Sequence, residues 1–127
     1  MIRRVSKKRA ALNKFVAQFR EDLRKEVGRC EFCLKPARWQ SLDVHELVTG
    51  IDRAKALDKR YAVLCLHRKC HDKIEQLIVS AQIAYLMRAR PADYDMPAYH
   101  LLTNRNWPDH QDNMSWFRYL FPKNKFP

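Results

Sequence analysis

Cys30-Glu-Phe-Cys33 and Cys65-Leu-His-Arg-Lys-Cys70-His71 are the two segments that decide the fold of this 127-residue chain. They place its four cysteines in two close pairs, with His45 isolated between them. Two separated cysteine pairs can surround one Zn²⁺ with four thiolates, and a closed tetrahedral zinc of this kind stabilises small domains. The spacing therefore predicts a structural Zn²⁺ held by Cys30, Cys33, Cys65 and Cys70.

Two alternatives to a four-thiolate zinc remain open on the sequence alone. His67 lies between the cysteines of the second pair and could replace one of them. Disulfides are the other use of paired cysteines, but in a reducing compartment such pairs more often hold metal. The basic start of the chain lacks the apolar core of a secretory signal, and no apolar run approaches the ~18–20 residues that span a bilayer. We therefore expect a cytoplasmic protein with no membrane partner.

The charge of the chain favours polyanionic partners. It carries 25 Lys and Arg residues against 14 Asp and Glu residues, a formal net charge of +11. A charge of that size favours nucleic acid ahead of an acidic membrane surface. Charge alone does not separate a nucleic-acid enzyme from a basic ribosome-associated protein.

The first quarter of the chain predicts a basic amphipathic helix from about Ser6 to Val27. Its apolar residues recur every three or four positions, Ser6 suits an N-cap, and Gly28 stops the helix before the first cysteine. The polar side either faces solvent or lies along phosphates. That side carries Lys7, Lys8, Arg9, Lys14, Arg20 and Arg24.

The rest of the chain predicts two strands, a long helix and an aromatic tail. Residues 39–48 suit a strand, residues 61–66 form an apolar run typical of a buried strand, and a helical turn is expected near residues 53–57 between them. A helix is expected from about His71 to Arg90, with Pro91 ending it. The aromatic residues after it, Trp107 and Trp116 among them, are expected to dock on the domain rather than stack on bases. We therefore expect one α+β domain, with a basic helix (1–28), a zinc-bearing core (29–90) and a helical to irregular C-terminal extension (91–127).

The histidines that a zinc leaves free predict a second metal site. His45 lies near the end of the first strand, His71 begins the helix, and Glu75 follows one turn later on the same helical face. Two imidazoles and a carboxylate can bind a divalent ion and leave positions open for water and phosphate, as catalytic sites do. Asp43, on the strand face of His45, is an alternative ligand or base.

The order Cys-x2-Cys, Asp43-Val-His-Glu46, Leu64-Cys-x4-Cys-His71 resembles the HNH (His-Me finger) endonucleases, in a zinc-containing form common among phage-encoded proteins. The resemblance covers Cys30 to about Glu75. It implies a ββα-metal core, in which a hairpin and a helix grip one catalytic ion, Mg²⁺ or Mn²⁺, beside the structural zinc. It also implies that His45 and His71 bind that ion and that Glu46 occupies the position of the general base.

The resemblance implies a metal-dependent DNA endonuclease of a bacterial or phage-infected cell, which nicks DNA or cuts both strands. Arg53 and Arg60, in the loop beside the site, are then expected to contact phosphates, and cleavage of both strands would ordinarily require a homodimer. Three residues depart from the family pattern, because Glu46 and Glu75 replace histidines and Arg60 replaces an asparagine. These departures favour the alternative, a non-catalytic zinc-stabilised DNA-binding or recombination-accessory protein.

Overall fold

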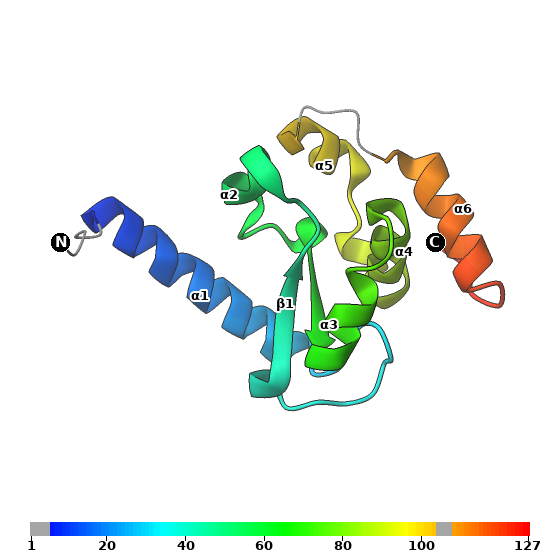
Figure 1. Ribbon diagram of the computed structural model, residues 1–127, viewed down its shortest axis with the longest axis horizontal. Coiled ribbons are helices and arrows are strands. Elements are labelled where there is room, and N and C mark those ends of the chain that lie inside the picture. The colour runs from blue at the N-terminus through cyan, green and yellow to red at the C-terminus, as the bar shows by residue number, and fades with distance from the viewer. Residues whose placement is uncertain (1–5, 104–107) are drawn as a thin grey trace.

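A two-stranded antiparallel sheet followed directly by a helix forms the centre of the molecule (Figure 1). The computed structural model describes residues 6–103 and 108–127. β1 (Leu42–Glu46) pairs with β2 (Val63–His67), so that His45 lies opposite Leu64. α3 (Arg68–Ile74) follows β2 without a break and packs against both strands. The mixed helix and strand content is the α+β class that the sequence predicted.

β2 forms the middle of the hydrophobic core. No side chain from Val63 to Leu66 is exposed (0% each), as the apolar run in the sequence indicated. α4 (Val79–Ala89) adds Ile83, Leu86 and Met87 to the same core. The hairpin is therefore anchored through β2, while β1 carries the side chains that reach the polar sites.

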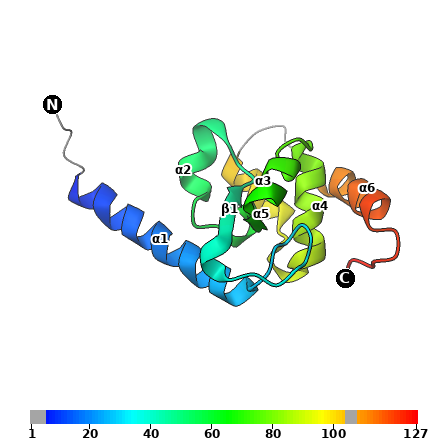
Figure 2. The same cartoon turned by 60° about the horizontal axis from the view of Figure 1, so that its bottom comes forward.

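α1 (Lys7–Val27) begins and ends where the sequence predicted. The Ser6 side chain caps its first turn, and Gly28 ends it in the left-handed conformation (φ 62°), which glycine adopts without steric cost. Its apolar stripe is covered only at the C-terminal end, because Leu23 is 1% exposed whereas Phe15 is 58% exposed. Figures 1 and 2 both show the N-terminal part of α1 projecting away from the other elements.

The single helix expected from His71 to Arg90 is wrong, because the chain breaks between α3 and α4. α3 ends at Ile74, and Ile78 is extended (ψ 154°) before α4 begins at Val79. The break leaves the Leu77 carbonyl without the helical N–H of Ala81, which donates to Ile78 instead. The side chain of Gln82 donates to the Leu77 carbonyl at 2.8 Å and so satisfies an acceptor that a continuous helix would have used internally.

The remaining elements surround this centre. α2 (Arg53–Ala56) lies in the loop between the strands, where a helical turn was expected, and the C-terminal extension forms α5 (Met96–Thr103) and α6 (His110–Leu120). In the described part of the chain, short 3₁₀ turns occur at Trp39–Ser41, Gly50–Asp52, Arg60–Ala62 and Pro91–Asp93.

The C-terminal extension is more helical than the sequence indicated, and it docks on the domain as expected. α6 packs on α4, where the rings of Tyr85 and Phe121 meet edge to face with centroids 5.1 Å apart. Trp107 lies outside the described residues. Within the described part of the chain, no helix combines the length and apolarity that crossing a bilayer needs.

Candidate metal centres

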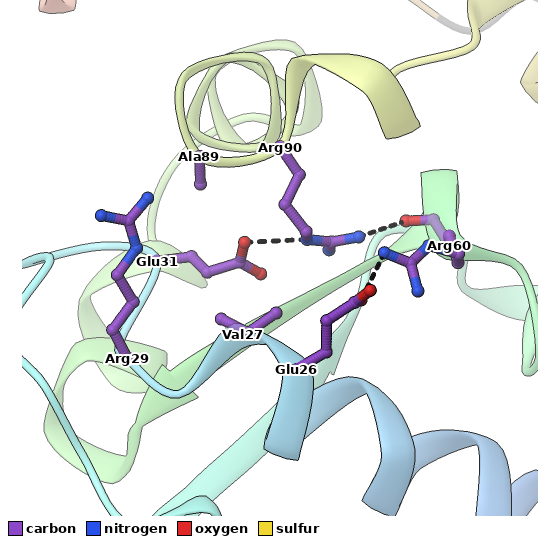
Figure 3. Close-up of a pocket in the computed structure, with 7 residues that line it drawn as sticks. All are labelled: Glu26, Val27, Arg29, Glu31, Arg60, Ala89 and Arg90. Atoms are coloured by element: carbon purple, nitrogen blue, oxygen red, sulfur yellow. Dashed lines mark hydrogen bonds and ion pairs between the residues drawn. The ribbon is translucent and has the colours of Figure 1, made fainter.

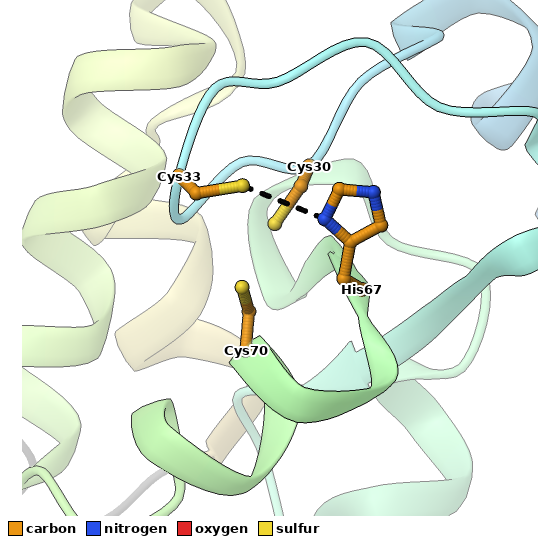
Figure 4. A group of neighbouring side chains, drawn as sticks. All are labelled: Cys30, Cys33, His67 and Cys70. Atoms are coloured by element: carbon orange, nitrogen blue, oxygen red, sulfur yellow. Dashed lines mark hydrogen bonds between the residues drawn. The ribbon is translucent and has the colours of Figure 1, made fainter.

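Four potential metal ligands converge where the first cysteine pair approaches the end of β2. The ligand atoms of Cys30, Cys33, His67 and Cys70 all lie within 4.8 Å of one another. Figure 4 shows that they come from the loop after α1, the end of β2 and the start of α3. Three thiolates and an imidazole are a known closed ligand set for tetrahedral zinc. This zinc-ligand cluster therefore fits one structural ion.

The electrostatics of the thiols also favour a cation at this cluster. Burial alone would raise the pKa of Cys33, but hydrogen bonds from the Lys35 backbone and from His67 lower it to about 7. Burial and the neighbouring Cys30 and Cys33 sulfurs raise the pKa of Cys70 to about 12. Crowded thiolates repel one another, so they ionise together only when a cation lies among them.

Cys65 is not a member of the zinc-ligand cluster, and the prediction of a four-cysteine site is wrong at this position. The ligand atoms that converge here include that of His67, two residues after Cys65, and not the Cys65 sulfur, which is fully buried in the core. The backbone N–H of Cys65 donates to Glu31 Oε1 at 2.9 Å, and its carbonyl accepts from the Glu31 N–H at 2.8 Å. Burial and the Glu31 carboxylate raise the pKa of Cys65 to about 12, so it is a neutral core thiol. The alternative ligand, His67, is the one that the structure places in the cluster.

Glu31, inside the first cysteine pair, is a buried anchor that sequence reasoning missed. Its side chain is 1% exposed and pairs with Arg90 Nε at 2.8 Å, as Figure 3 shows. Arg90 also donates to Asp93 at 2.8 Å, so the ion pair ties the cysteine loop to the end of α4. A carboxylate in a short Cys-x2-Cys loop is ordinarily exposed, and nothing in the local sequence marks this one as buried.

A second group of potential metal ligands lies next to the zinc-ligand cluster and includes His71, the residue after Cys70. His45 from β1, His71 from α3 and Glu75 at the end of α3 have ligand atoms within 4.8 Å of one another. The two imidazole rings meet edge to face with centroids 4.8 Å apart, and His71 Nε2 lies 3.1 Å from Glu75 Oε1. The structure therefore brings together the three residues that the sequence singled out for a second ion. We call them the histidine–glutamate cluster.

Each imidazole of the histidine–glutamate cluster has a polar partner outside it. Asp43 Oδ2 lies 3.2 Å from His71 Nδ1, and Gln82 Oε1 lies 2.7 Å from His45 Nε2. Metal-binding histidines commonly donate their second ring nitrogen to such a carboxylate or carbonyl oxygen. Burial lowers the pKa of His45, which keeps the ring neutral near pH 7, as a ligand must be. The donors and their surroundings therefore fit a divalent ion.

Glu46, the expected general base, is not brought to this cluster. Side chains alternate along a strand, so Glu46 and its neighbour His45 project from opposite faces of β1. The Glu46 carboxylate accepts hydrogen bonds from Arg53 Nε at 2.6 Å and from Arg20 Nη2 at 3.0 Å. Burial alone would raise the pKa of Glu46, but these hydrogen bonds outweigh it and lower the pKa. Two arginines therefore hold Glu46 as an anion.

Both arginines expected to contact phosphates are engaged within the chain. Arg53 pairs with Glu46, as above, and Arg60 pairs with Glu26 at 2.6 Å and with Asp93 at 2.9 Å. Figure 3 shows Arg60 reaching Glu26 at the end of α1. Arg60 therefore links α1 to the turn after α4.

A cationic groove borders the histidine–glutamate cluster. Its volume is about 430 Å³. The residues that line it include Arg20, Arg24, Arg68, Asp43 and His71. Arg68 is 82% exposed and makes one ion pair, to Asp43 at 3.2 Å. Arg20 pairs with Glu46 and Arg68 with Asp43, so the three arginines exceed these two carboxylates by one charge, and this arginine groove is positive.

Compared with known proteins, the chain matches no protein-family model, no curated protein and no solved structure. Among residues 6–103 and 108–127, fold and site define an α+β protein with two clusters of potential metal ligands, one between the loop after α1 and the start of α3 and one between β1 and α3.

Proposed function

We propose that the chain is a zinc-stabilised, metal-dependent endonuclease that hydrolyses phosphodiester bonds in DNA. The observation that carries this proposal is the histidine–glutamate cluster, in which His45, His71 and Glu75 meet at the junction of a hairpin and a helix. A donor set of two nitrogens and one carboxylate leaves coordination positions for water and phosphate. A structural zinc, by contrast, would have four protein ligands and no such position.

In this proposal the residues of the chain hold the ion and orient its ligands. A bound divalent ion polarises the scissile phosphate and makes a bound water more acidic. Asp43 accepts a hydrogen bond from His71 Nδ1, which directs Nε2 of that ring towards Glu75. Glu46 pairs with Arg20 and Arg53 on the other face of β1, so in this proposal it orients these two arginines and takes no proton from the bound water.

The charge distribution supports DNA as the substrate. The arginine groove leads to His71 and offers Arg20, Arg24 and Arg68 to a phosphate backbone. The free part of α1 adds Lys7, Lys8, Arg9 and Lys14, with no acidic residue in its first turn. Contacts of this kind are independent of sequence, so the affinity for DNA falls as salt rises.

A plasmid assay tests the proposal. Zinc-loaded wild-type protein is expected to nick supercoiled DNA in Mg²⁺ or Mn²⁺, and His45→Ala is expected to lose that activity while keeping its zinc. His100→Ala, on α5 and outside both clusters, is the matched control and should nick like wild type. If the folded wild-type protein nicked DNA with neither ion, the proposal that it is an endonuclease would be refuted.

The second candidate, a non-catalytic zinc-stabilised DNA-binding or recombination-accessory protein, is favoured by one observation. Glu46 is held by two arginines on the face of β1 away from His45. This candidate predicts salt-dependent DNA binding without nicking, and no loss of that binding in His45→Ala. Measuring binding and nicking on the same preparations separates the two functions.

A further inference from the structure

We infer that Gln82 is a positioning residue that fixes which ring nitrogen of His45 is free to bind a metal ion. The identity of the ion rests on the proposed function, whereas the hydrogen bonds that carry the inference do not depend on it. Gln82 lies on α4, 37 residues from His45 in sequence, and both side chains are 7% exposed. The contact between them is thus shielded from competing water.

Two hydrogen bonds determine the orientation of the Gln82 amide. Its Nε2 lies 2.8 Å from the Leu77 carbonyl oxygen, which can only accept. The amide nitrogen therefore faces Leu77, and the amide oxygen faces His45 Nε2 at 2.7 Å. Because that oxygen also only accepts, the hydrogen of this bond belongs to His45 Nε2.

The consequence is that Nδ1 is the nitrogen of His45 that can bind an ion. A metal ligand needs a ring nitrogen without a hydrogen, and the second nitrogen is commonly held by an outer partner. Within residues 6–103 and 108–127, no hydrogen bond to His45 Nδ1 is found. His71 is held the other way round, because Asp43 contacts its Nδ1 and leaves Nε2 beside Glu75. The two rings therefore offer opposite nitrogens to one ion.

The break between α3 and α4 makes this arrangement available. In a continuous helix the Leu77 carbonyl would accept from the N–H of Ala81. Here the N–H of Ala81 donates to Ile78 instead, at 3.0 Å, which leaves the Leu77 carbonyl for the Gln82 side chain. The irregular segment thus orients the amide that orients the histidine.

Nitrogen-15 NMR of the histidine rings in the zinc-loaded protein, without added Mn²⁺, tests the inference directly. We expect His45 to carry its hydrogen on Nε2 in wild type and to become a mixture of tautomers in Gln82→Met, which has a similar shape but no amide. Gln76→Met, at an exposed position just after α3, is the control and should leave the His45 signals unchanged. A hydrogen on Nδ1 in wild type, or an unchanged tautomer in Gln82→Met, would overturn the inference.

Metal affinity supplies the second measurement. Mn²⁺ titration by calorimetry should show binding to Gln82→Met weakened by about 10- to 100-fold, the usual effect of losing an outer partner of a ligand histidine. Gln82→Glu keeps an oxygen for His45 Nε2 and should keep the Nε2 hydrogen. If Gln82→Met does not fold, the tautomer of the wild-type protein decides the matter, because a hydrogen on Nδ1 overturns the inference. A wild-type protein that binds no Mn²⁺ and does not nick DNA would refute the proposed function. The tautomer of His45 would still confirm or overturn the role of Gln82.

Discussion

Replacing His67 with alanine should weaken zinc binding strongly, whereas replacing Cys65 with alanine should leave it almost unchanged. Structural zinc contributes about 10–16 kcal/mol in small zinc-dependent folds. Divided evenly over the four ligands Cys30, Cys33, His67 and Cys70, this free energy is roughly 2.5–4 kcal/mol for each ligand. At about 1.4 kcal/mol per factor of ten, loss of His67 lowers zinc affinity by about two to three orders of magnitude.

Cys65→Ala removes one buried sulfur and no ligand. Its side chain is 0% exposed in the centre of β2, so the expected cost is about 1 kcal/mol of unfolding free energy from lost packing. Competition for zinc against a chromogenic chelator measures the affinity of each variant, and urea unfolding measures its stability. His67→Cys is the matched control, because it restores a fourth ligand and should bind one zinc tightly. If Cys65→Ala lost zinc and His67→Ala did not, the assignment of ligands would be refuted.

Three further changes test the packing around these sites. Glu31→Gln keeps an acceptor for the Cys65 N–H but removes the negative charge that pairs with Arg90. The free energy of unfolding, measured with urea, should therefore fall by about 3 kcal/mol. A fall of less than about 1 kcal/mol would contradict a strong buried ion pair. Gly28→Ala places a residue with a side chain at a backbone φ of 62°, so the free energy of unfolding should fall by about 1 kcal/mol and the thermal unfolding midpoint should drop. An unchanged midpoint would contradict the left-handed helix cap. Burial opposes the shift, but hydrogen bonds from Arg53 and Arg20 lower the pKa of Glu46 below the ordinary value for a glutamate. Its stabilisation is therefore complete above that ordinary value and is lost as pH falls through the folded-state pKa. Urea midpoints from pH 6 to 3 should therefore fall more steeply in wild type than in Glu46→Gln, and parallel curves would count against this.

The parts of the fold that the sequence predicted are those with local causes. Ser6 and Gly28 mark the ends of α1 through their own backbone preferences, and the apolar run ending at Leu66 marks a buried strand. The break before α4 has no glycine or proline to announce it. At the break the Gln82 amide replaces a helical hydrogen bond at Leu77. The periodicity of the apolar residues contains no sign of this exchange and therefore predicts a helix that continues through the break.

The candidate sites also contain residues that local geometry brings together and residues that only the tertiary fold brings together. His71 and Glu75 are four residues apart, so helical geometry alone placed them together. The choice between Cys65 and His67 depends on how far β2 extends before it meets the cysteine loop, which the spacing of cysteines does not state. The partners of Arg60 were also hidden, because Glu26 and Asp93 are 34 and 33 residues away from it.

The two clusters are mechanically linked, because Cys70 and His71 are consecutive residues of α3. Zinc bound by Cys70 would fix the start of α3 against the cysteine loop, and that position also sets where His71 meets His45. Removing zinc should therefore disturb the histidine–glutamate cluster even though no zinc ligand belongs to it. It follows that inhibition by a strong chelator would not reveal which ion supports cleavage. The informative experiment keeps one zinc per chain, verified by elemental analysis, and varies only Mg²⁺ or Mn²⁺. Activity that depends on those ions at constant zinc content, and that His45→Ala abolishes, would assign catalysis to the second cluster, whereas activity that follows zinc alone would refute that assignment.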